Sequence, residues 1–138
     1  MSAVKELIRT EKDGSISFGD YELATKTKKP DFEFEGDVYK VKTFKEITRL
    51  EKNEMFVYES EPGTAVHELK TDAGKMTFDV DGPEDAMITV MGEPDTNYEI
   101  FVEGELRDTQ KSNLGGKISF SVEFNEDKPV HVEISKKN

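Results

Sequence analysis

Apolar and polar side chains alternate along much of the chain with a period of two residues. The alternation is clearest at residues 75–80, 87–90, 98–104, 117–124 and 130–134. This period is typical of strands with one buried and one exposed face. Glycine, proline and asparagine fall between these runs, where chain reversals need them. The pattern therefore predicts an antiparallel β-sandwich in the C-terminal half, with a polar loop following Gly104.

The N-terminal part reads as two hairpins. Asp13-Gly14 separates extended runs at residues 4–11 and 15–23, and Gly36-Asp37 separates residues 31–35 from 38–42. Asp-Gly between such runs favours a two-residue turn, because both turn residues need positive φ. We expect the basic stretch that ends at Pro30 to be a turn, because proline interrupts strand interiors.

One short helix is predicted after the second hairpin. Thr43 and Glu46 have the spacing of a capping box, and Phe44, Ile47 and Leu50 recur every three residues. The alternative is a strand that continues from residue 38, since a helix of this length is marginal alone.

The strongest internal break is Ser60-Glu-Pro-Gly-Thr64. We place a module boundary here, giving an N-terminal β-hairpin module at 1–64 and an immunoglobulin-like sandwich at 65–138. Each part falls near the size at which an independent core becomes marginal. The fold class is therefore mainly β, with one short helix in the first module.

Composition narrows the classes of partner. The 138 residues are 34% hydrophobic and 36% charged, with a net charge of −11. An acidic surface repels nucleic acid and anionic lipid, so neither is expected as a partner. There is no cysteine, no apolar stretch of signal-peptide length near the start, and no apolar run long enough to cross a membrane. These features predict a cytoplasmic protein.

Pro94, Thr96 and Tyr98, followed by alternating Ile100 and Val102, resemble the tyrosine corner of immunoglobulin-like and fibronectin type III domains. The resemblance implies that the Tyr98 ring packs inward and that its hydroxyl bonds upstream backbone. At least three predicted strands follow Tyr98, more than those families have. The rhythm of residues 98–104 and 116–122 also resembles small sandwiches appended to polysaccharide-degrading enzymes.

Taken whole, the chain resembles short uncharacterised bacterial proteins, some labelled endosialidase. The likeness rests on Lys5–Glu11, "KELIRTE", and Val57–Val66, "VYESEPGTAV". A sialidase would need clustered arginines for the substrate carboxylate. Arg9, Arg49 and Arg107 share no motif.

No motif for catalysis, cofactor or zinc binding is visible, since His67 and His131 stand sixty-four positions apart. Asp79, Asp81, Glu84 and Asp85 crowd one turn and are the calcium candidates, although their spacing matches no EF-hand loop. A solvated acidic turn explains these four carboxylates equally well. Lys26, Lys28 and Lys29 form a basic patch that either docks an acidic neighbour or is an ordinary exposed loop.

These features favour a non-catalytic structural or protein-binding module that self-associates or binds another protein, with no cofactor. Alternating strands leave sheet edges that must be blunted or used for pairing. The alternative is a carbohydrate-binding or glycosidase accessory protein with a glycan as its ligand.

Overall fold

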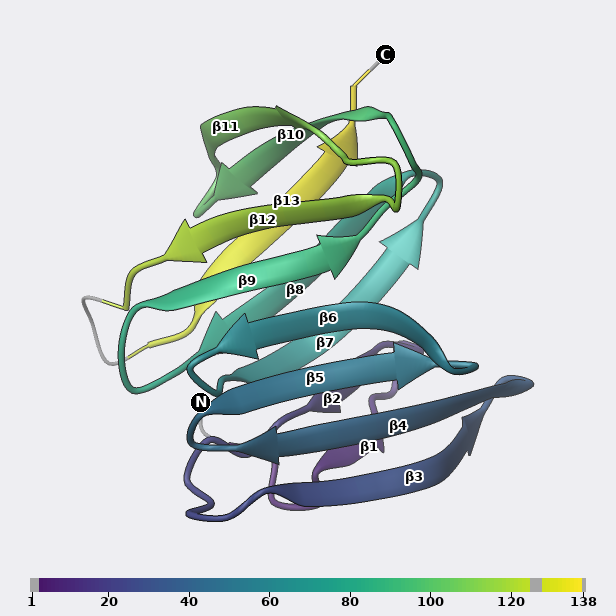
Figure 1. Cartoon of the computed structure of the whole chain (residues 1–138), viewed down its shortest axis with the longest axis vertical. Helices are drawn as coiled ribbons and strands as arrows, with labels where there is room; N and C mark the ends of the chain where they lie inside the picture. The colour runs from purple at the N-terminus through teal and green to yellow at the C-terminus, as the bar shows by residue number, and fades with distance from the viewer. Residues whose placement is uncertain (1–2, 125–127, 138) are drawn as a thin grey trace.

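The computed structural model describes residues 3–124 and 128–137, which form thirteen strands in two antiparallel sheets. The sheets lie one behind the other and make a two-layer sandwich (Figure 1). The described residues contain no helix. The mainly β fold class is therefore confirmed.

Each sheet takes strands from the whole length of the chain. Sheet A contains, in spatial order, β1 (Ile8–Thr10), β2 (Ile16–Phe18), β7 (Ala65–Asp72), β8 (Lys75–Asp81), β13 (Val130–Lys136), β10 (Asn97–Val102) and β11 (Glu105–Lys111). Sheet B contains, in spatial order, β12 (Lys117–Val122), β9 (Ala86–Met91), β6 (Met55–Glu61), β5 (Ile47–Lys52), β4 (Asp37–Phe44) and β3 (Thr27–Phe34).

The segment predicted as a module boundary is the crossing between the two sheets. The chain leaves sheet B at the end of β6 and enters sheet A at the start of β7. On either side of this crossing, β2 pairs with β7 and β6 pairs with β9. Residues 1–64 and 65–138 therefore share both sheets.

The predicted short helix is wrong, and the alternative of a continuing strand holds. Residues 43–50 belong to the β4–β5 hairpin, whose turn is Lys45-Glu46. A two-residue turn places Phe44 directly opposite Ile47, so the same three-residue spacing arises without a helix. The Thr43 hydroxyl makes no helix cap; it bonds the Thr48 hydroxyl and accepts the Asp20 N–H.

Two further expectations change at the sheet edges. Pro30 lies inside β3, which is an edge strand with a register shift between Lys29 and Phe32. Proline is tolerated at such a position because its missing N–H falls where no ladder bond is required. Residues 105–111, predicted as a polar loop, form the edge strand β11.

Tyr58 lies at the centre of the core. Its ring is fully buried and packs edge-on against Phe18 at 5.3 Å and Phe78 at 5.7 Å between ring centroids. Phe18 and Phe78 come from sheet A and Tyr58 from sheet B, so these contacts bridge the two layers. Aromatic pairs of this geometry are worth about 0.5–1.5 kcal/mol beyond the area that they bury.

A buried chain of hydroxyl groups fixes the crossing between the sheets. Thr64 Oγ1 is 2.8 Å from the Tyr58 hydroxyl and 2.7 Å from the Ser60 hydroxyl. The Thr48 hydroxyl donates to the Thr64 carbonyl and accepts the Thr64 N–H. Burial raises the pKa of Tyr58, so the phenol stays protonated and available for these bonds.

Side chains cover the backbone edge of β12. The Gln110 side-chain amide donates to the Ser119 carbonyl at 2.8 Å and accepts the Ser119 N–H at 3.0 Å. This pair of bonds reproduces what a neighbouring strand would make, so the edge is blunted against strand addition.

Of the described residues, none belongs to a helix long and apolar enough to cross a membrane.

Candidate functional site

The sandwich is open at one end, which carries the β1–β2, β3–β4, β5–β6 and β7–β8 turns. In Figure 1 the β3–β4 and β5–β6 turns project to the right. A hollow of about 560 Å³ lies here and takes residues from both sheets. We call it the end groove. Its apolar lining consists of Ile16, Phe34, Tyr39, Met55, Phe56, Val57, Leu69, Met76 and Met91.

A second hollow of about 360 Å³ adjoins the end groove and shares Thr71, Met76 and Met91 with it. Its lining reaches the core residues Val90, Tyr98, Ile118 and Ile134. Both hollows have the size of ligand-binding pockets, which fall at about 300–1,000 Å³. The two hollows lie side by side at the same end of the sandwich, and we call them together the channel.

The presence of three methionines in this lining affects what it can hold. Met76 is buried, Met91 is half-buried, and Met55 is 67% exposed at the mouth. Methionine is unbranched and polarizable, so it adapts to ligands of different shape. An exposed methionine at the mouth of an apolar hollow is already placed for contact with a partner.

The rim of the end groove carries both signs of charge. Lys52 Nζ lies 3.4 Å from Asp37, and Lys70 Nζ lies 3.4 Å from Asp13. A hydrogen bond from the Asn53 amide lowers the pKa of Asp37, and one from a serine hydroxyl lowers that of Asp13. Both carboxylates are therefore ionised at neutral pH.

Two further carboxylates add to the rim. Glu35 lines the end groove, and Glu54 lies on the turn beside it. Neither forms an ion pair with a described residue. Because the rim lysines already face carboxylates, the mouth of the groove has a negative excess.

Tyr98 lines the second hollow of this channel. It is buried, and its hydroxyl accepts the backbone N–H of Glu93 at 2.8 Å, the kind of upstream bond that the sequence predicted. Gly92 packs on the phenol so closely that a β-carbon there would lie 2.8 Å from the hydroxyl oxygen. Thr96 Oγ1 donates to the Pro94 carbonyl at 2.8 Å. The bond from Glu93 thus ties the loop leaving sheet B to the first strand after it in sheet A.

The four calcium candidates do not converge. Asp79 accepts a hydrogen bond within sheet A, Asp81 is buried, Glu84 is exposed, and Asp85 accepts the backbone N–H of Phe124 at 3.4 Å. In the described part of the chain, no group of three or more His, Asp or Glu side chains could hold a metal ion. Asp79 and Asp85 bind different partners, so these carboxylates do not form one set of ligands.

The two histidines, which are far apart in sequence, stand opposite the same aspartate. Asp79 pairs with His67 across β7–β8 and with His131 across β8–β13. His131 Nδ1 lies 2.6 Å from Asp79 Oδ1, while His67 is buried. The alternation of apolar and polar residues could not reveal that both histidines face Asp79, because this depends on which strands are neighbours and in what register they pair.

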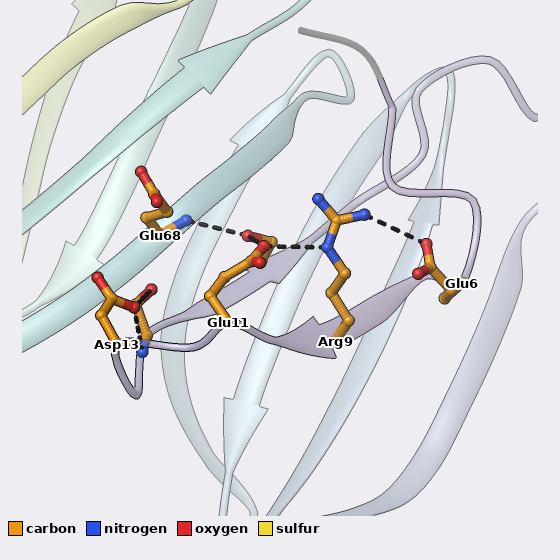
Figure 2. A network of polar contacts seen from close by, with 7 residues as sticks. Glu6, Arg9, Glu11, Asp13 and Glu68 are labelled. Carbon is orange, nitrogen blue, oxygen red and sulfur yellow. Dashed lines mark hydrogen bonds and ion pairs between the residues drawn. The ribbon is translucent and has the colours of Figure 1, made fainter.

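A charged network continues across the outer face of sheet A, as Figure 2 shows. Arg9 reaches Glu6 at 3.4 Å and Glu11 at 2.9 Å, and Ser17 donates to Glu11 while accepting the backbone N–H of Glu68. The bond from Ser17, and then the one from Arg9, lowers the pKa of Glu11. These groups satisfy one another and fix β1 on β2 and β7.

The three arginines lie on β1, β5 and β11 and each has its own partners. Arg9 binds Glu11, Arg49 binds Glu59 at 2.9 Å, and Arg107 donates to the Ser121 carbonyl at 3.5 Å. The structure does not bring them together.

No family model, curated protein or solved structure matched this chain.

Proposed function

We propose that this protein is a non-catalytic binding module whose end groove takes the apolar side chains of a partner protein segment flanked by basic residues. The observation that carries the proposal is the channel at the turns, whose lining includes a group of apolar side chains with three methionines among them. Concave, mostly apolar sites with a few polar groups at their edge are the usual form of binding sites.

The apolar lining supplies the affinity. Burying one leucine or phenylalanine side chain contributes about 1.5–3 kcal/mol. Two such side chains give about 3–6 kcal/mol, which corresponds to dissociation constants from about 6 mM to about 0.04 mM before the entropic cost of association is subtracted. This scale suits a reversible contact.

The charge of the rim selects the segment. Glu35 and Glu54 leave the mouth negative, and the whole chain carries a net charge of −11. A field of this sign attracts basic segments and raises their association rate. An apolar segment with lysine or arginine on either side therefore fits better than one with acidic flanks.

We also propose that this chain belongs with the immunoglobulin-like and fibronectin type III-like sandwiches. This membership is supported by the bond between the Tyr98 hydroxyl and the Glu93 N–H. Such sandwiches serve many unrelated functions, so this kinship adds nothing to the choice of ligand.

Fluorescence anisotropy with a labelled synthetic peptide tests the proposal. The peptide carries a Phe-Leu pair between lysines, and its matched control carries the same pair between glutamates. We expect the lysine peptide to bind and the glutamate peptide to bind at least about tenfold more weakly. Equal affinity of the two peptides, or no binding of either, would overturn the proposal.

A pair of methionine variants places the binding. Met55 at the mouth is 67% exposed and Met87 on β9, outside the groove, is 51% exposed, so neither substitution removes core packing. Met55→Ser should reduce peptide affinity without changing the charge of the rim, while Met87→Ser should leave it unchanged. Sugar binding on a glycan array that Met55→Ser abolishes would instead assign the groove to a carbohydrate.

A further inference from the structure

The outer face of sheet B carries a row of cations on this acidic chain. Register places Lys28 directly opposite Lys42, and Lys42 directly opposite Arg49. Lys40 lies on the same strand and face as Lys42, two residues earlier. We call Lys28, Lys40 and Lys42 the basic row.

Like charges directly opposite each other in a sheet are destabilising. Arg49 is neutralised by Glu51 at 3.2 Å and Glu59 at 2.9 Å. Lys28 and Lys42 form no ion pair with any carboxylate of the described residues. Lys40 lies directly opposite Glu51, so the uncompensated positive charge of the row is carried by Lys28 and Lys42, on a chain of net charge −11.

Protection of a sheet edge does not explain the row. Lysines on edge strands discourage unwanted pairing, which accounts for Lys28 on β3. Lys40 and Lys42 lie on β4, an internal strand already paired on both sides. On its two neighbouring strands Lys42 faces Lys28 and Arg49 and no carboxylate, so its charge is available to an anionic surface.

The chain itself presents such a surface at the opposite edge of the sandwich. A hollow of about 500 Å³ is lined by Glu103, Glu105 and Glu123, together with Arg107 and Lys128. We call the three glutamates the acidic hollow. It lies beside β11 and β12, which are the edge strands of the two sheets that are farthest from β3. In Figure 1, β11 lies at the top and β3 at the bottom.

We propose that the chain self-associates head to tail, with the basic row of one copy docked on the acidic hollow of the next. The basic row on β3 and β4 and the acidic hollow beside β11 and β12 lie too far apart to meet within one molecule, so they can meet only between copies. Different surfaces in contact make a heterologous interface, which gives rings or open filaments. The proposal does not depend on the end groove, because neither surface includes a residue that lines it.

Salt separates the local attraction from the repulsion between two acidic copies. At about 0.1 M salt the Debye length is about 10 Å, so repulsion between whole molecules is screened while contacts at a few ångströms persist. At about 1 M salt it is about 3 Å and the contacts weaken too. We expect sedimentation velocity to show association that depends on protein concentration at about 0.1 M salt. This association should be lost at about 1 M salt.

Charge reversal provides the decisive test. Lys28→Glu/Lys42→Glu and, separately, Glu103→Lys/Glu105→Lys should each weaken self-association at least about tenfold. Mixing the two double variants restores complementary surfaces and should restore association. Lys12→Glu/Lys137→Glu, which changes the net charge equally at exposed sites elsewhere, should retain it.

A monomeric wild-type chain at about 0.1 M salt would overturn the proposal, as would a mixture that fails to associate although both double variants stay folded. A monomeric chain that binds an acidic polysaccharide through Lys28 and Lys42 would assign the row to a glycan instead. Met55→Ser, which leaves the net charge unchanged, should leave self-association unchanged, so failure here and failure of the groove proposal are distinguishable.

Discussion

The hydroxyl group of Thr64 offers the sharpest test of how the crossing between the sheets is held. Thr64 is fully buried and bonds both Tyr58 and Ser60, which are buried as well. Thr64→Val keeps the volume and removes the shared hydroxyl. Tyr58 also interacts with Ser60, so the two remaining hydroxyls still have each other. We expect this single variant to lose about 1–3 kcal/mol of unfolding free energy.

Two further substitutions should change stability in opposite directions. Adding Ser60→Ala strands the Tyr58 hydroxyl in the core, which costs about a further 1–3 kcal/mol. Adding Tyr58→Phe to that double variant removes the stranded group, so stability should rise by a similar amount. Replacing all partners by apolar groups of the same shape can be nearly neutral, whereas leaving one unpaired is costly.

Urea denaturation measures these differences directly. With a slope of about 1–3 kcal/mol per molar urea, a change of about 2 kcal/mol moves the midpoint by about 1 M. A triple variant less stable than the double variant, with equal slopes, would refute the view that the hydroxyls form one satisfied network.

Three other expectations follow from single contacts. Tyr98→Phe removes the acceptor of the Glu93 N–H, so we expect a loss of about 1 kcal/mol and faster hydrogen exchange of the Glu93 amide; unchanged exchange would contradict the bond. Gly63→Ala would place a β-carbon 2.0 Å from the carbonyl oxygen of Phe44, so the thermal unfolding midpoint should fall well below that of wild type. An unchanged midpoint would show that Gly63 and Phe44 do not pack this closely. The lowered pKa of Glu11 contributes stability above its unfolded value near 4.5, and this is lost as the pH falls through the folded value. The stability advantage of wild type over Glu11→Gln should therefore be constant above about pH 5 and vanish in acid, and urea midpoints across that range check this.

The strands that the sequence predicts correctly are those with one buried face. In β12, for example, Ile118, Phe120 and Val122 are buried while the residues between them are exposed. Strand β11 escaped prediction because an edge strand outside the core carries no such alternation. The false helix came from Phe44 and Ile47, whose spacing a two-residue turn produces as readily as a helix does.

Features that depend on strand order could not be predicted from the sequence. The end groove combines four turns with Met91 from a fifth part of the chain, and the pairing of Asp79 with both histidines needs the register of three strands. The notable lysines at residues 26–29 were visible in the sequence, but the cation opposite Lys28 was not, because Lys42 lies fourteen positions away on the neighbouring strand. Long-range pairing, rather than local propensity, assembles these surfaces.

Methyl NMR of the methionines tests the groove proposal most directly. Of the five methionines, Met55, Met76 and Met91 line the channel and Met87 lies outside it. On titration with the lysine-flanked peptide, we expect the methyl signals of the three channel residues to shift together while that of Met87 stays in place. Shifts confined to Met87, or no shift at peptide concentrations that saturate the anisotropy signal, would contradict binding in the end groove.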